Sequence, residues 1–138
     1  VVANLSQKLN QRLLKTKQTV MITGASGCLG QTLIDRMDFE RYTVWALGRD
    51  KSRLQSMYQS YKDVQCYGYD DIPTGDLRLG LVDTLIHCGF ARPHKSNEEI
   101  AESLHLTKKL YEQATKHQIP NIINISSQSV YGTKQPLP

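Results

Sequence analysis

Three glycines at intervals of three residues follow the first apolar run of this 138-residue chain. The stretch reads TVMITGASGCLGQTLID, residues 19–35, and its glycines are Gly24, Gly27 and Gly30. The apolar run before them predicts a buried strand, and the periodicity after them predicts a helix. Glycine in such a turn lets a ligand or another stretch of backbone come closer than a side chain would permit. The chain is therefore limited to folds in which a strand, a close-contact turn and a helix follow one another directly.

Strand-like and helix-like segments alternate along the rest of the chain. The predicted strands cover residues 19–23, 42–48, 64–67, 84–87 and 121–125, and the predicted helices cover residues 29–37, 51–61 and 96–116. Ser96 and Glu99 form a capping-box pattern, and Ile100, Leu104 and Leu110 of that last helix are expected to face inward. Apolar strands that alternate with helices indicate a parallel sheet covered on both faces. The predicted fold is an α/β, Rossmann-like doubly wound parallel sheet that stops after about its fifth strand.

The context of the glycines favours a phosphate-binding turn. A glycine-rich turn between the first strand and first helix of such a fold gathers backbone N–H groups at a positive helix end, which suits a pyrophosphate. The amides expected to line it belong to Gly24, Ser26, Gly27, Cys28, Leu29 and Gly30. Three spaced glycines alone would also fit an ordinary tight strand-to-helix turn.

Three segments together resemble the extended short-chain dehydrogenase/reductase superfamily, which includes NAD(P)-dependent epimerases and dehydratases of nucleotide sugars. TGASGCLG is similar to the family's Thr-Gly-x-x-Gly-x-x-Gly signature, and VDTLIHCGF, residues 82–90, to its fourth strand. NIINISSQSVYG, residues 121–132, resembles its fifth strand with the Ser-Ser-x-x-Val-Tyr-Gly signature. Cys88 and Gly89 stand where the family usually has two other small residues, and the resemblance places both near the cofactor.

The resemblance assigns Ser127 as the catalytic serine, with Ser126 beside the cofactor. In the family this serine works with a Tyr-x-x-x-Lys motif some two dozen residues later, and the sequence stops at Pro138. Tyr131 does not fit that motif because Gln135 stands in the lysine position. The alternative is that these serines only satisfy backbone groups of a loop.

Cofactor preference is predicted from the end of the second strand, which reads ALGRD. Gly48 stands where enzymes that prefer NAD place an acidic residue, and Arg49 offers a guanidinium to the extra phosphate of NADP. NADP is therefore the preferred cofactor and NAD the second candidate. The alternative is that Arg49 is a surface arginine paired with Asp50 or Asp38.

Two acidic residues follow the third strand. Asp70 and Asp71 look like the family's acidic pair near the adenine, although a solvated acidic turn ahead of Pro73 is the alternative. We expect no metal ion in the site.

The first 18 residues differ in character from the domain predicted for residues 19–138. Lys8, Arg12, Lys15 and Lys17 account for much of the net charge of +4, and they alternate with leucines at helical spacing, namely Leu5, Leu9, Leu13 and Leu14. This basic amphipathic leader is expected to be a solvated helix packed on its own domain or a partner subunit, with a membrane-surface or nucleic-acid segment as the alternative. No apolar run approaches the roughly 20 residues of a membrane span, and Cys28, Cys66 and Cys88 match no disulfide or zinc pattern. The chain is expected to be cytoplasmic, without nucleic acid as a partner.

The sequence is compatible with three classes of function. The first is an oxidoreductase, epimerase or dehydratase of a nucleotide sugar, of which the chain is the cofactor-binding half, with a homodimer as one candidate assembly. The second is a reductase of a non-sugar carbonyl. The third is a non-enzymatic dinucleotide-binding regulatory module, because fold analogy alone does not fix an activity.

Overall fold

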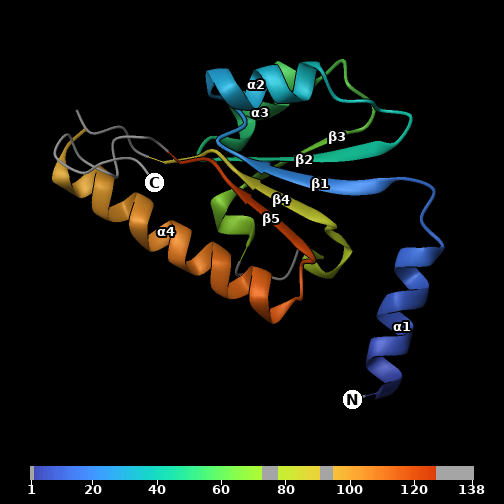
Figure 1. Cartoon of the computed structure of the whole chain (residues 1–138). Coiled ribbons are helices and arrows are strands. Elements are labelled where there is room, and N and C mark those ends of the chain that lie inside the picture. The colour runs from blue at the N-terminus through green and yellow to red at the C-terminus, as the bar shows by residue number, and fades with distance from the viewer. Residues whose placement is uncertain (1, 73–77, 91–94, 127–138) are drawn as a thin grey trace, which may run out of the picture.

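The computed structural model describes residues 2–72, 78–90 and 95–126 of the chain. They form one five-stranded parallel sheet with helices on both faces (Figure 1). The strands are β1 (Gln18–Thr23), β2 (Tyr42–Gly48), β3 (Val64–Gly68), β4 (Thr84–His87) and β5 (Asn121–Asn124). The helices are α1 (Val2–Leu13), α2 (Cys28–Asp35), α3 (Lys51–Tyr58) and α4 (Asn97–Lys116), with the 3-10 turns η1 (Tyr69–Asp71) and η2 (Leu79–Leu81). The strand order β3-β2-β1-β4-β5 confirms the predicted Rossmann-like doubly wound fold.

The two faces of the sheet are covered by different helices. Figure 1 shows α2 and α3 on one side and α4 on the other. Side chains of β1 alternate between the two layers: Val20 and Ile22 pack with buried residues of α2 and α3, and Met21 packs with those of α4. Full burial of a side chain of this size contributes roughly 1.5–3 kcal/mol. Both layers therefore hold β1 at the centre of the sheet.

The carboxyl ends of the four strands β1 to β4 lie level with one another. Thr23 of β1 is in register with Leu47 of β2 and with His87 of β4, and Gly48 of β2 is in register with Gly68 of β3. From β1 the chain first builds outward to β2 and β3, and then crosses to β4 on the other side. In doubly wound sheets ligands bind at the carboxyl edge where the order of strands reverses.

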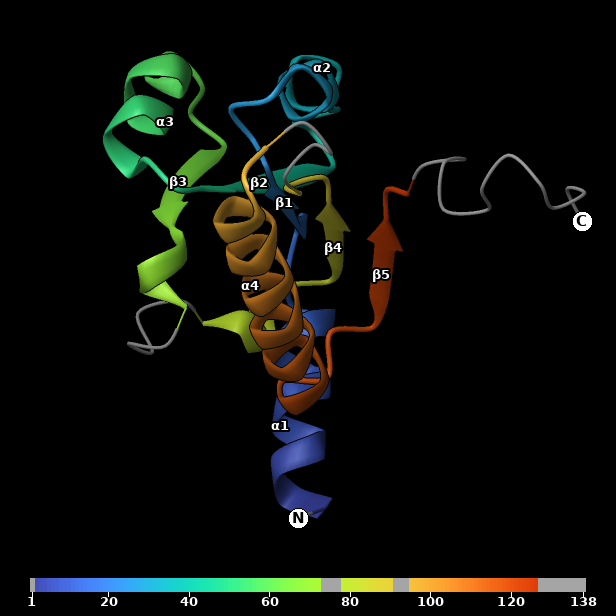
Figure 2. The ribbon, with the colours of Figure 1, turned by 90° about the vertical axis from the view of Figure 1, so that its left-hand side faces the viewer.

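The edge strand β5 is less covered than predicted. All four of its residues are exposed, and Ile122 and Ile123 keep 46% and 49% of their surface in contact with solvent. Leu104 of α4 is 57% exposed, so the prediction that it faces inward is wrong, whereas Leu110 is buried as predicted. The strand β5 is exposed because no described element lies beyond it, as Figure 2 shows.

The helix α1 stands away from the sheet (Figures 1 and 2). Its connection to the domain is polar: Lys15 donates to the Leu81 carbonyl and pairs with Asp83, and Lys17 Nζ lies 2.9 Å from Asp63 Oδ1. The leucines of the leader are exposed rather than packed on the described domain; they are Leu5, Leu9, Leu13 and Leu14. Within the described residues, every helix is too short or too polar to cross a membrane.

Candidate functional site

The glycine turn after β1 is shaped by contacts within the chain. Gly24 has a φ of +65°, and a Cβ there would lie 2.8 Å from the Cα of Gly89, which follows β4. A Cβ on Gly30 would lie 2.4 Å from the Gly24 carbonyl oxygen. Neither position has room for a side chain, and the left-handed φ of Gly24 independently favours glycine. Two of the three glycines thus let β1, α2 and the end of β4 approach one another.

The outer part of the same turn faces solvent. Gly27, Cys28 and Leu29 are exposed and Ser26 is half-buried. Gly27 is the N-cap residue of α2 and supplies no side-chain cap, while the first N–H groups of a helix have no acceptor within it. The positive end of α2 is therefore presented outward with donors available to an anion.

A buried hydrogen-bond network ties the turn to β4. The Thr23 hydroxyl oxygen accepts from the backbone N–H groups of Cys88 and Gly89, each at 3.2 Å. The Thr23 hydroxyl lies 2.6 Å from Nδ1 of His87, and it donates its own proton to this nitrogen. The backbone of Cys88 and Gly89 is thereby held against the glycine turn, and these predicted cofactor residues do lie beside Gly24.

The network continues through His87 to α4. The Thr107 hydroxyl donates to the Ser103 carbonyl at 2.8 Å, so it accepts from Nε2–H of His87 at 3.0 Å. These two bonds give His87 a neutral ring with its proton on Nε2. The side chain is 3% exposed, and its burial lowers the pKa of His87. One neutral imidazole therefore links β1, β4 and α4 beneath the site.

Arg49 follows β2 at the same edge of the sheet and is exposed. Asp50, one of its two alternative partners, instead caps α3 by accepting from the Arg53 N–H at 2.9 Å. Asp38 accepts from the Glu40 N–H. No ion pair joins Arg49 to any carboxylate among the described residues. Its guanidinium is thus open to a ligand.

The two predicted adenine-side carboxylates have different surroundings. Asp71 accepts from the Gly68 N–H at 2.8 Å and from Lys51 Nζ at 3.0 Å, and these bonds lower the pKa of Asp71. They join the end of β3 to α3, so Asp71 stabilises the contact between these two elements. Asp70 is exposed beside it. Both residues lie next to the end of β2, but their contact with a cofactor stays a prediction.

Tyr69 is a residue of this site that the sequence reasoning missed. It directly follows β3, and its hydroxyl oxygen would lie 2.7 Å from a Cβ built on Gly89. Nothing in the sequence around Tyr69 signals this contact, because it depends on how β3, β1 and β4 are placed across the sheet. The sequence signal that could have indicated this contact is Gly89, which stands where the family usually has another small residue.

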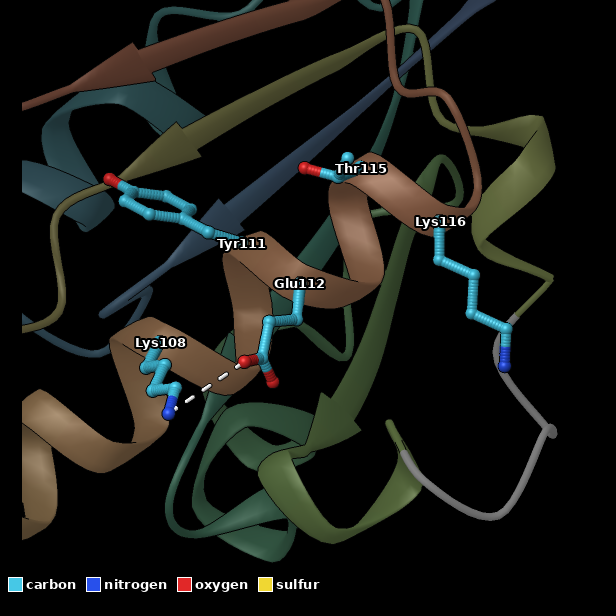
Figure 3. Close-up of a pocket in the computed structure, with 5 residues that line it drawn as sticks. All are labelled: Lys108, Tyr111, Glu112, Thr115 and Lys116. Carbon is cyan, nitrogen blue, oxygen red and sulfur yellow. Dashed lines mark ion pairs between the residues drawn. The ribbon is translucent and has the colours of Figure 1, made fainter.

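The remaining predictions concern the chain after β5. Ser126 is exposed, and Ser127 lies outside the described residues. A surface pocket on α4 is lined by Lys108, Tyr111, Glu112, Thr115 and Lys116, as Figure 3 shows. The pocket follows the second half of α4, and Tyr111 reaches the last residue of β5, where its hydroxyl donates to Asn124 Oδ1 at 2.6 Å. None of the residues predicted to bind the cofactor lines it. No cluster of three metal-binding side chains occurs among the described residues.

Solved structures share this fold. Uronate dehydrogenase from Agrobacterium tumefaciens aligns with a TM-score of 0.66 at 21% identity, covering 82% of this chain and 42% of that one. UDP-glucose 4-epimerase from Bifidobacterium longum, in complex with NAD+ and UDP, aligns with a TM-score of 0.60 at 23% identity, covering 88% and 40%. Gre2 from Candida albicans, in complex with NADPH, aligns with a TM-score of 0.62 at 19% identity, covering 83% and 38%. The chain thus spans less than half the length of each.

The family is established by the sequence itself. No curated protein matches the chain. The model of the NAD dependent epimerase/dehydratase family matches residues 20–138, which include the glycine turn, all of β2 to β5 and the two serines after β5. This chain belongs to the NAD dependent epimerase/dehydratase family.

Proposed function

We propose that the chain is the cofactor-binding part of an NAD(P)-dependent oxidoreductase or epimerase. The dinucleotide would lie across the carboxyl edge of the sheet, with its pyrophosphate on the backbone amides of Ser26, Cys28 and Leu29. The Gly27 N–H is not among these donors, because it donates to the Gly24 carbonyl at 2.9 Å within the turn. The observation that carries the proposal is the exposed, uncapped N-terminus of α2, positioned by the contact of Gly24 with Gly89. Such an end binds phosphate through oriented N–H groups and the helix dipole. Family membership and the neighbours in complex with NAD+ and NADPH support the same cofactor class.

NADP is the preferred form of the cofactor in this proposal. Arg49 stands at the end of β2, where the ribose of the adenosine half lies in this fold. It forms no ion pair with a described residue. Its charge interacts with the Glu99 carboxylate only beyond ion-pair distance, so a phosphate would compete with this weaker attraction. Guanidinium pairs well with phosphate because it can donate two parallel hydrogen bonds.

The substrate is proposed to be a nucleotide sugar, with a non-sugar carbonyl compound as the second candidate. Hydride transfer at such a carbon requires a proton to move at its oxygen. By resemblance to the family, Ser127 would hydrogen-bond this oxygen while a downstream Tyr and Lys move the proton. Free cysteines at positions 28, 66 and 88 are consistent with a cytoplasmic enzyme, and a homodimer remains the proposed assembly.

A carboxylate placed in the glycine turn tests the binding site. Ser26→Asp adds a negative charge at a half-buried position of the turn and should weaken NAD(P)H binding at least tenfold by repelling the pyrophosphate. Ser56→Asp makes the same change on the exposed face of α3 and should leave binding unchanged. Cofactor fluorescence titrations measure both. Equal binding by wild type and Ser26→Asp would overturn this placement of the pyrophosphate.

A second comparison separates an enzyme from a regulatory module. The 138-residue chain should bind cofactor without turnover, because a missing proton-transfer group costs typically 10²–10⁴-fold in rate. The longest natural form of the protein should reduce or epimerise its substrate, and Ser127→Ala in that form should lose most activity. A long form that binds NADP(H) but turns over none of the nucleotide sugars and carbonyl compounds offered would favour the module.

A further inference from the structure

The hydroxyl of Tyr69 lies at the centre of the site, in the space that a side chain at Gly89 would fill. Tyr69 starts η1 directly after β3, two strands away from β1 in the sheet. Its phenol oxygen would nevertheless lie 2.7 Å from a Cβ on Gly89, and the Gly24 nitrogen would lie 2.9 Å from that same Cβ. The phenol oxygen, the first amide of the glycine turn and the backbone after β4 therefore meet at one point. An alanine at position 89 would compete with the hydroxyl for this space.

The phenol is held as a hydrogen-bond donor. The Gly24 backbone N–H interacts with the phenol oxygen and lowers the pKa of Tyr69, but burial outweighs this effect and raises it above its usual value. The hydroxyl thus keeps its proton at neutral pH. No acceptor for that proton is found among the residues that the structure describes, and Arg49 is close enough to add a positive potential. A protonated phenol beside a cation and a helix N-terminus favours an acceptor oxygen that carries negative charge.

The position of Tyr69 identifies the half of the ligand that it would meet. Strand order places β2 and β3 on one side of β1 and β4 on the other. In a doubly wound fold the ribose of the adenosine half lies toward the end of β2, while the pyrophosphate sits at the first helix. Tyr69 reaches Gly24 from the β3 side, so it lies between these two parts of the expected binding path.

We propose that Tyr69 is a further cofactor-binding residue, whose hydroxyl, seated in the space left by Gly89, donates a hydrogen bond to an oxygen on the adenosine side of the bound dinucleotide. The inference rests on the proposed function, since it requires a dinucleotide at this edge. The hydroxyl is also one of two neighbours that leave no room for a methyl group at Gly89, the other being the Gly24 backbone. Tyr69 and Gly89 thus act as a pair that sets how the adenosine half is held.

Removing the single oxygen atom of Tyr69 tests the inference. Tyr69→Phe keeps the ring, and it should weaken ADP-ribose and NADPH by the same factor of roughly 2 to 150, the range for a hydrogen bond to a neutral or charged acceptor. Binding of nicotinamide mononucleotide should not change, because that probe lacks the adenosine half. Tyr67→Phe is the matched control: its hydroxyl bonds to Gln65 at the exposed surface, and its loss should leave all three ligands unaffected. Titrations are made by calorimetry on the longest natural form of the protein.

The outcomes separate this inference from the proposed function. Unchanged or tighter ADP-ribose binding by Tyr69→Phe, in a protein whose wild type binds it, overturns the role of Tyr69 and leaves the cofactor site standing. Absence of nucleotide binding by the wild type overturns both. Gly89→Ala gives a second measure: in a folded variant, judged by its thermal unfolding, it should weaken ADP-ribose at least as much as Tyr69→Phe. Wild-type affinity in Gly89→Ala would also contradict the pairing.

Discussion

A single exposed side chain, Arg49, carries the predicted choice between the two cofactors. Arg49→Ala should cost NADP(H) binding on the order of 1.5–3 kcal/mol, the range for hydrogen bonds to charged groups, and should leave NAD(H) binding nearly unchanged. Arg53→Ala removes another exposed arginine four residues later and serves as the control. Titration of both cofactors against the three proteins measures the effect. If the wild type bound NAD(H) and NADP(H) equally, the role of Arg49 would be refuted.

His87 makes the stability of the fold depend on pH. Its pKa is lowered by burial in the folded state, so the unfolded chain binds a proton more readily. The stability that depends on neutral His87 is therefore fully present above about pH 6.5, its unfolded value, and is lost as the pH falls through the lower folded value. His87→Gln should be less stable at pH 7.5 but show a flatter decline from pH 7 to pH 5.

Urea unfolding at several pH values measures this decline. His105→Gln changes an exposed histidine of α4 and should keep the wild-type pH dependence. An equally steep decline in His87→Gln would assign the effect to other groups.

At the scale of elements, α4 begins with a complete capping box. Ser96 Oγ accepts from the Glu99 N–H at 3.2 Å, and Glu99 accepts in return from the Ser96 N–H at 3.1 Å. Ser96→Ala should lower the free energy of unfolding by about 1 kcal/mol, the usual cost of losing an N-cap side chain. Ser56→Ala, at an exposed position within α3, should have little effect. Denaturant unfolding that shows the same stability for both variants would mean that the box does not hold α4.

Local patterns predicted the elements well, and long-range contacts explain what they missed. The second strand was predicted as Tyr42–Gly48, as found, and the capping box placed the start of α4 correctly. Leu104 was misplaced because periodicity shows that a side chain is apolar but not which element is there to cover it. Tyr69 was missed because its contact with Gly89 joins residues that only the sheet brings together. The assignments of Ser26, Arg49, Asp70 and Ser127 to the site stay predictions.

For the molecule as a whole, the outer edge of β5 has no strand beside it among the described residues, and it carries apolar side chains. Ile122, Ile123 and Ile125 are each more than 40% exposed beside it, and exposed edge strands pair with other chains. The 138-residue chain should therefore associate as its concentration rises. Ile123→Lys should shift this association to several-fold higher concentration, because a charge at the edge opposes pairing. Sedimentation velocity over a concentration series measures it.

A control variant distinguishes the edge from the leader. Leu14→Lys alters an 83% exposed leucine after α1 and should leave the association unchanged. If Leu14→Lys were the variant that abolished association, the leader and not β5 would be the contact.

The contact between Gly24 and Gly89 also has a consequence for the way the site is made during synthesis. During synthesis β1, the glycine turn and α2 are made before β2, and β1 can pair with β2 soon afterwards. The backbone that packs on Gly24 arrives more than 60 residues after it, with the residues that follow β4. Contacts of such long sequence separation form late because the loop between them must first be closed. The turn that carries the most local signature in the sequence therefore acquires its working shape only once β4 has joined the sheet, and a nucleotide can serve as a ligand for the folded domain but not as a template for its first half.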